Sequence, residues 1–111
     1  MSILTMNEDN IDAMLAEDGI LVVDAWAAWC GPCRMFAPVF DKAAAAFTKH
    51  RFAKLDTEAN ASLLEDLGIK HIPTLLIYRD GILVYREPGT MDFNALQELI
   101  DKIEELDMDG V

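Results

Sequence analysis

The seven residues from Ile20 to Trp26, ILVVDAW, are apolar apart from Asp24. A near-continuous apolar run rich in β-branched residues is typical of a central strand that is buried on both faces. Such a strand needs a layer of helices on each side of its sheet. The run therefore indicates an α/β fold, and it raises the question of why one carboxylate lies among apolar neighbours.

Helical and strand-like segments alternate along the chain. Short strands are predicted near Ile3 and over 52–56, 74–78 and 82–86, the last two forming a hairpin turned at Asp80-Gly81. Apolar periodicity predicts helices over 7–16, from the cysteines to about Lys49, over 59–67 and over 93–106. The order βαβαβαββα predicts a central mixed β-sheet with helices on both faces. The long helix is expected to bury Met35, Phe36, Val39, Phe40 and Phe47.

Length and charge limit the organisation and the partners. A chain of 111 residues is long enough for one core, which predicts a single domain over 1–111. The net charge of −11 would repel phosphate backbones and anionic membrane surfaces, so we expect neither nucleic acid nor a membrane as a partner. The first ten residues lack the basic start and long apolar core of a signal peptide, and no apolar run could span a bilayer. These features predict a cytoplasmic protein.

Cys30 and Cys33 are the only cysteines, so any intramolecular disulfide joins them in a small ring. A structural disulfide across so short a loop stabilises a fold little, and the cytoplasm keeps such bonds reduced. A zinc site would have to recruit His50 and His71, without the second closely spaced pair of the usual pattern. Both alternatives stay open, but the position of the pair between a strand and a helix favours a reversible dithiol. Cys30 would lie at the helix N-terminus, where the helix dipole stabilises a thiolate, and Cys33 would be shielded one turn further in.

The sequence resembles the thioredoxin family. WCGPC at Trp29 to Cys33 matches the active-site motif of that family. Further landmarks follow in the family's order and spacing between Ile3 and Leu106: Ala37-Pro38, KLD at Lys54 to Asp56, IPT at Ile72 to Thr74, Asp80-Gly81 and Gly89. The resemblance implies the thioredoxin fold, a cis peptide before Pro73, and a thiol–disulfide oxidoreductase that reduces protein disulfides generally.

The resemblance also implies roles for individual residues. Cys30 would attack a target disulfide as a thiolate, and Cys33 would resolve the mixed disulfide. Asp24, buried and with a raised pKa, would accept the proton that Cys33 loses, whereas the structural alternative is an Asp satisfied by backbone donors. Lys54, on the strand expected beside Asp24, would partly offset the buried charge, whereas the alternative is an exposed strand lysine. No metal or separate cofactor is implied, because the redox group is the Cys30–Cys33 pair itself.

A docking surface is implied around the motif. In the family, an extended target segment pairs with the backbone before Pro73, which predicts a surface of Trp29, Gly31, Pro32, Ile72, Pro73 and Gly89. Trp26 is expected to pack beneath the site. His71 should lie near the rim, either tuning the thiolate and the choice of target or simply solvated. The sequence departs from the family pattern at two positions. Ala25 stands where the family has a bulky aromatic residue, and Arg34 stands where it has lysine. Neither change removes a reactive group.

Two function classes follow. The first is a monomeric disulfide reductant that is recharged by a thioredoxin reductase and acts on disulfide-containing proteins. An oxidase or isomerase is disfavoured, because such relatives carry a histidine in place of Pro32. The second is a redox-independent binding subunit or regulator that uses the same docking surface and in which the cysteines matter little.

Overall fold

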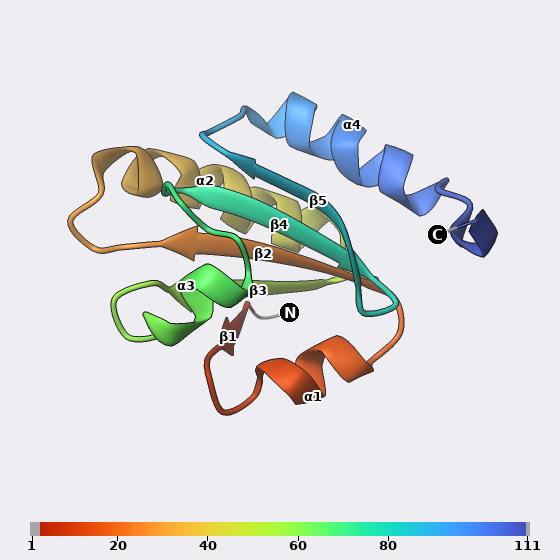
Figure 1. Cartoon of the computed structure of the whole chain (residues 1–111). Helices are drawn as coiled ribbons and strands as arrows, with labels where there is room; N and C mark the ends of the chain where they lie inside the picture. The colour runs from red at the N-terminus through yellow and green to blue at the C-terminus, as the bar shows by residue number, and fades with distance from the viewer. Residues whose placement is uncertain (1–2, 111) are drawn as a thin grey trace.

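The computed structural model describes residues 3–110, which form a five-stranded sheet with helices on both faces (Figure 1). Met1, Ser2 and Val111 belong to the expected 1–111 domain but lie outside the described residues. The predicted order βαβαβαββα is confirmed, followed by a short 3₁₀ helix at Met108–Gly110. The elements are β1 Leu4–Met6, α1 Ile11–Ala16, β2 Ile20–Trp26, α2 Gly31–Ala46, β3 Arg51–Asp56, α3 Ser62–Asp66, β4 Thr74–Arg79, β5 Ile82–Pro88 and α4 Phe93–Glu104.

The sheet has the strand order β1-β3-β2-β4-β5, with β2 in the centre. β1, β3 and β2 run parallel, whereas β4 is antiparallel to β2 and β5 is antiparallel to β4. The mixed sheet is therefore as predicted. The register places Asp24 of β2 opposite Lys54 of β3 and opposite Leu75 of β4.

Alternate residues of β2 enter two cores on opposite faces of the sheet. Leu21, Val23 and Ala25 pack with residues of α1 and α3 on one face. Ile20 and Val22 pack on the other face with residues of α2 and α4. Figure 1 shows the two pairs of helices on opposite sides of the sheet. Because both faces are covered, the apolar run of β2 is buried along most of its length.

The predicted bounds of two helices are wrong by about a turn. α1 begins at Ile11 and not just after Asn7, because Asn7 and Asn10 form a turn before the helix. The side-chain oxygen of Asn7 accepts a hydrogen bond from the backbone N–H of Asn10 at 2.9 Å, and the side-chain oxygen of Asn10 accepts one from the backbone N–H of Asn7 at 2.8 Å. α2 ends at Ala46 and not near Lys49. Phe47 leaves helical geometry there and starts a turn into β3.

α3 is shorter than the predicted 59–67, and the burial predicted for Met35 is wrong. Asn60 holds the chain in a turn before α3, because its side chain donates to the carbonyl of Asp56 at 3.0 Å and accepts from the N–H of Glu8 at 3.0 Å. Met35 is 78% exposed because it lies on the face of α2 that is turned away from the sheet. Phe36 and Phe40 are fully buried as predicted, whereas Val39 and Phe47 are only partly buried.

The hairpin between β4 and β5 is fastened to the turn before β2. Asp80 and Gly81 form its turn, both with positive φ. The backbone N–H of Asp80 donates to the carbonyl of Gly19 at 2.9 Å, and the Asp80 carboxylate accepts from the N–H of Gly19 at 2.8 Å. Gly81 also lies against the backbone carbonyl of Leu15 in α1, where a Cβ would collide. These contacts fix one end of the sheet, opposite the end that carries the cysteines.

Candidate active site

Cys30 and Cys33 lie where β2 passes into α2, and their sulfur atoms form a disulfide. Cys30 is the N-cap of α2, and its Sγ accepts a hydrogen bond from the backbone N–H of Cys33 at 3.2 Å. This N–H belongs to the first turn, whose donors have no partner within the helix. The helix N-terminus is therefore directed at the Cys30 sulfur, which is the arrangement that stabilises a thiolate.

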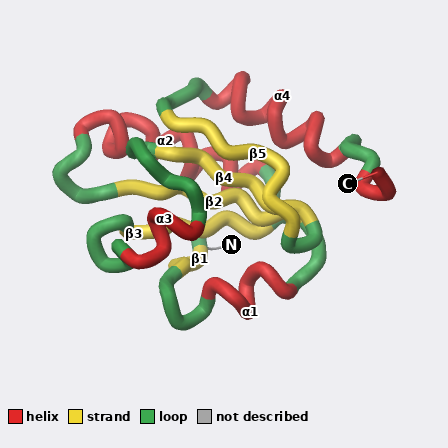
Figure 2. The backbone as a smooth tube through the Cα atoms, in the orientation of Figure 1, coloured by secondary structure: helices red, strands yellow, loops and turns green. Residues whose placement is uncertain are grey.

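The loop before β4 lies near the start of α2, which carries the cysteines, at the same end of the sheet (Figure 2). The Cys30 Sγ lies 3.9 Å from the carbonyl oxygen of Ile72, and the Ile72–Pro73 peptide is cis, which confirms that prediction. The N–H of Gly89, just after β5, donates to the carbonyl of Pro73 at 2.8 Å. The structure thus brings Ile72 beside Cys30, and Gly89 from a separate segment against Pro73.

Exposure distinguishes the two tryptophans. Trp29 is 66% exposed, and its indole N–H donates to the Glu58 carboxylate at 2.7 Å. Trp26 is half-buried and packs beneath the site, in a small cluster with Ala27 and the two cysteines, as expected. Both cysteines are buried in the disulfide form, at 4% and 3% exposure. The two cysteines therefore differ in their position in the helix and not in their solvent accessibility.

Asp24 is fully buried, and in residues 3–110 neither of its carboxylate oxygens has a hydrogen-bond partner. The alternative of a carboxylate satisfied by backbone donors is thereby ruled out. Burial raises the pKa of Asp24 to about 6, and the nearby Lys54 ammonium opposes this rise. Because Val23 and Ala25 face α1 and α3, strand alternation places Asp24 on the opposite face of the sheet, which α2 covers. Asp41 of α2 also raises the pKa of Asp24.

Lys54 is the positive charge beside this carboxylate. Its Nζ lies 3.7 Å from an Asp24 oxygen, and its side chain is 28% exposed. The same ammonium lies 5.6 Å from the centre of the Trp26 ring. Lys54 thus occupies the predicted neighbouring strand, half-buried and in contact with the acid, so the alternative of a fully exposed lysine does not hold.

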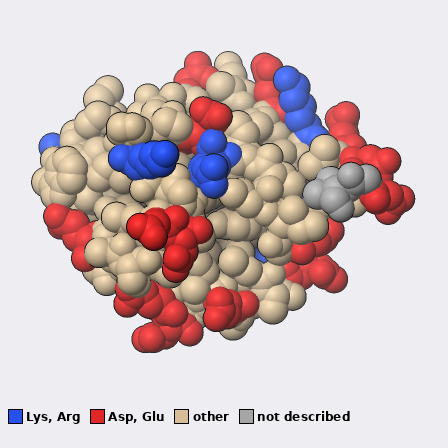
Figure 3. All heavy atoms as spheres, viewed as in Figure 1, with Lys and Arg blue, Asp and Glu red and all other residues tan. Residues whose placement is uncertain are grey.

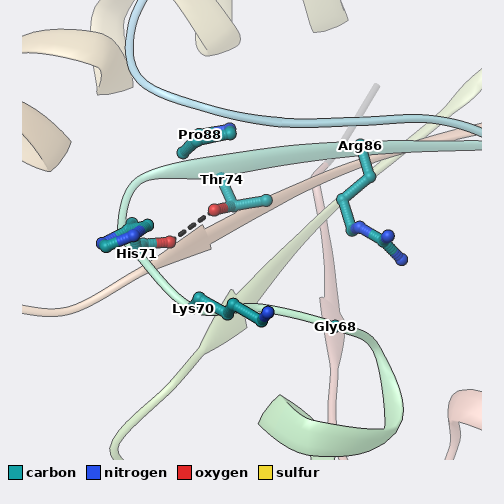
Figure 4. A pocket seen from close by; sticks show the side chains of 6 residues that line it. All are labelled: Gly68, Lys70, His71, Thr74, Arg86 and Pro88. Carbon is teal, nitrogen blue, oxygen red and sulfur yellow. Dashed lines mark hydrogen bonds between the residues drawn. The ribbon is translucent and has the colours of Figure 1, made fainter.

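Two hollows that the sequence did not reveal flank the Ile72–Pro73 loop. A pocket of about 230 Å³ lies beside Trp29, and Thr57, Leu64 and Ile69 contribute to its lining. A pocket of about 220 Å³ on the other side is lined by Gly68, Lys70, His71, Thr74, Arg86 and Pro88 (Figure 4). Only the position of His71 at the rim was anticipated, because the other residues come together through the packing of α3 and β5.

His50 does not belong to the site. It follows α2, a helix of 16 residues whose axis spans about 24 Å at 1.5 Å per residue, while the cysteines lie at the start of that helix. Its Nε2 lies 2.6 Å from the Glu104 carboxylate. Within residues 3–110, no three His, Cys, Asp or Glu side chains gather as a metal site would require. No helix in this range is long and apolar enough to cross a membrane.

Comparison with known proteins gives a concordant result. The family model described as Thioredoxin matches residues 2–102. A curated protein of Streptomyces coelicolor named "Putative thioredoxin 2" is 40% identical over 110 residues, which cover 99% of this chain and 82% of that protein.

Proposed function

Because this chain belongs to the thioredoxin family and carries its paired cysteines, it is a thiol–disulfide oxidoreductase, and we propose that it serves as a general reductant of disulfides in other proteins. The observation that carries the proposal is the position of the Cys30–Cys33 pair at the N-terminus of α2, beside the Ile72–Pro73 loop. We further propose that residues 1–111 form a single domain and that the protein is a monomer.

Cys30 is the attacking residue in this proposal. In the reduced protein its thiolate attacks one sulfur of a target disulfide, forms a mixed disulfide and releases the other target sulfur as a thiolate. The N-cap position supports this role, because the unpaired N–H groups and the dipole of α2 lower the pKa of a thiol there.

Cys33 then completes the exchange. Its thiolate attacks the Cys30 sulfur, so the second target sulfur leaves as a thiolate and the Cys30–Cys33 disulfide forms. Two electrons have passed to the target, which gains two thiols. Asp24 is the acceptor for the proton that Cys33 gives up, and a carboxyl with a pKa of about 6 holds or releases a proton near neutral pH. Lys54 limits the cost of the ionised Asp24.

The target docks as an extended segment on the surface around the disulfide, where Trp29, Pro32 and Gly89 are exposed. The backbone at Ile72 would pair with it, and the small size of the neighbouring positions would admit many sequences. The docking surface comprises Trp29, Gly31, Pro32, Ile72, Pro73 and Gly89. A thioredoxin reductase would return electrons to the disulfide, and the cytoplasm, where disulfides are kept reduced, is the compartment in which such a reductant works.

The test is the turnover of an insulin-type disulfide with dithiothreitol as the electron source. Wild type should accelerate reduction, and Cys33→Ser should be much slower, because its mixed disulfide has to be cleaved by dithiothreitol in place of the missing resolving thiol. If neither wild type nor Cys33→Ser accelerates reduction over dithiothreitol alone, the cysteines are not the working groups, and the chain acts instead as a redox-independent binding subunit.

Alkylation of the reduced protein tests the order of the two thiols. A limiting reagent near pH 7 should label Cys30 before Cys33, because only Cys30 occupies the N-cap of α2. Peptide mapping identifies the labelled residue. Faster labelling of Cys33 would exchange the two roles.

A further inference from the structure

Three residues with basic side chains, Lys70, His71 and Arg86, line the pocket on the β5 side of the Ile72–Pro73 loop (Figure 4). We call it the basic pocket. Arg86 comes from β5 at the edge of the sheet, whereas Lys70 and His71 come from the connection between α3 and β4. The basic residues thus reach one hollow of about 220 Å³ from two distant parts of the chain.

Arg86 is positioned from one side and keeps free donors. One N–H of its guanidinium donates to the carbonyl of Leu67 at 3.4 Å. The lack of a side chain at Gly68 makes room for it, because a Cβ there would lie 2.7 Å from an Arg86 nitrogen. A guanidinium has five N–H donors, and within residues 3–110 Arg86 uses one of them. The remaining donors are available to a ligand.

The positive charges of the pocket are not neutralised within the described chain. Over residues 3–110, no carboxylate oxygen lies within 4.0 Å of the nitrogens of Lys70 or Arg86. The Thr74 hydroxyl cannot serve as a further donor, because it already donates to the carbonyl of His71 (Figure 4). The hydrogen-bond donors that the pocket presents to a ligand are therefore mainly charged N–H groups.

This concentration of positive charge is unusual for the molecule. Acidic residues outnumber basic residues by 20 to 9. Figure 3 shows acidic side chains scattered over one face, mostly toward its rim, and two basic side chains close together near its middle with acidic side chains nearby. An acidic target is repelled by the molecule as a whole, so it gains a favourable contact only where its carboxylate reaches such a pocket.

The basic pocket is continuous with the proposed docking surface. Lys70 and His71 immediately precede Ile72, whose carbonyl faces the Cys30 sulfur at 3.9 Å. Pro88 pairs with Thr74 across β4 and β5, directly before Gly89 of the docking surface. A target segment at Ile72 thus lies next to the pocket.

We propose that the basic pocket binds the carboxylate of an Asp or Glu side chain of the target protein, a few residues from the attacked cysteine. The proposal rests on the proposed function and adds a preference among targets. Lys70 precedes Ile72 by two residues, and an extended target segment advances about 3.3 Å per residue, so we place the acid two or three residues from the cysteine. Lys70 and Arg86 would hold the carboxylate through charge-assisted hydrogen bonds.

Matched peptide disulfides test this preference. Each peptide carries one Glu within three residues of the cysteine, on either side, and is paired with the same peptide carrying Gln. The pre-reduced protein is mixed with each peptide, and the second-order rate constant of reduction is measured. In the best position we expect wild type to reduce the Glu peptide about three- to tenfold faster than its Gln partner, with the ratio falling as salt is added.

Three variants of the pocket and one control variant test whether the preference arises in the pocket. Arg86→Gln should bring the Glu-to-Gln ratio close to one, and Arg86→Glu should favour a Lys peptide instead. Lys102→Gln removes the same charge from α4, away from the pocket, and should keep the wild-type ratio. Lys70→Gln should also lower the Glu-to-Gln ratio. Because Lys70 is a second residue of the pocket, this variant tests the proposal even where the Arg86 variants fold poorly.

The outcomes separate this proposal from the function on which it rests. If wild type reduces every peptide but the ratio is one at all positions, or if the ratio survives in both Arg86→Gln and Lys70→Gln, the pocket has no role in recognition and the reductase function stands. If wild type reduces none of the peptides, the reductase function fails and the pocket proposal fails with it.

Discussion

Replacing Asp24 with Asn should stabilise the folded protein at neutral and alkaline pH. Asp24 is fully buried without a hydrogen-bond partner in residues 3–110, and burial raises its pKa from an ordinary value of 3.8 to about 6. A difference of roughly two pH units corresponds to about 3 kcal/mol, at about 1.4 kcal/mol for each unit. That free energy is what the fold loses when Asp24 ionises in its buried position.

The direction of the pH dependence follows from which state ionises first. As pH rises above about 4, the unfolded chain releases the Asp24 proton while the folded protein still holds it, so the unfolded state is favoured. The loss of stability grows until pH passes the folded pKa of about 6 and is constant above it. Asn cannot ionise and escapes this loss. The mutant should therefore gain about 3 kcal/mol over wild type at pH 8 and close to nothing below about pH 4.

Urea unfolding of the oxidised proteins between pH 3 and pH 8 measures this gain, because the disulfide removes both thiols from the titration. A gain of that size moves the midpoint by about 1 to 3 M urea. The exposed Asp101→Asn is the matched control and should show no such pH-dependent gain. Disulfide turnover of Asp24→Asn should fall, since Asn cannot take the proton that we propose Cys33 passes to Asp24. A mutant less stable than wild type at pH 8 would refute the reasoning, because Asp24 would then be a stabilising, ionised carboxylate.

Three further substitutions test the Lys54–Asp24 contact and the backbone at two glycines. Lys54→Met removes the ammonium that lies 3.7 Å from the Asp24 carboxylate and that opposes the rise in the Asp24 pKa. In the same urea series, the stability that the protein loses when Asp24 ionises should therefore be larger in this variant and should extend to higher pH. A Lys54→Met profile that overlays wild type would show that the two groups do not interact. Gly19→Ala should cost about 1 to 2 kcal/mol through its positive φ alone, whereas Gly81→Ala should cost clearly more in thermal unfolding, because its Cβ also meets the carbonyl of Leu15. Equal losses would mean that the backbone at Gly81 moves away freely.

The active site could be predicted where its chemistry is contiguous in the sequence. Asp24 and the two cysteines lie within ten residues, and a strand followed by a helix fixes their relation. The bounds of α1 could not be predicted, because two asparagines three residues apart, Asn7 and Asn10, each could begin the helix or form a turn.

The basic pocket was not predictable for a different reason. Arg86 reaches Lys70 only because β5 is hydrogen-bonded to β4 and because Gly68 leaves space at the end of α3. The exposure of Met35 likewise could not be predicted, because it depends on how α2 is rotated against the sheet.

The edges of the sheet also determine how the protein avoids joining copies of itself. β1 at one edge has three residues, too few to seed a long ladder with a second chain. At the other edge, the part of β5 nearest the disulfide reads Arg86, Glu87 and Pro88, and a proline has no N–H to offer an added strand. Both edges of the sheet are thus protected against the strand-by-strand growth that leads to aggregates.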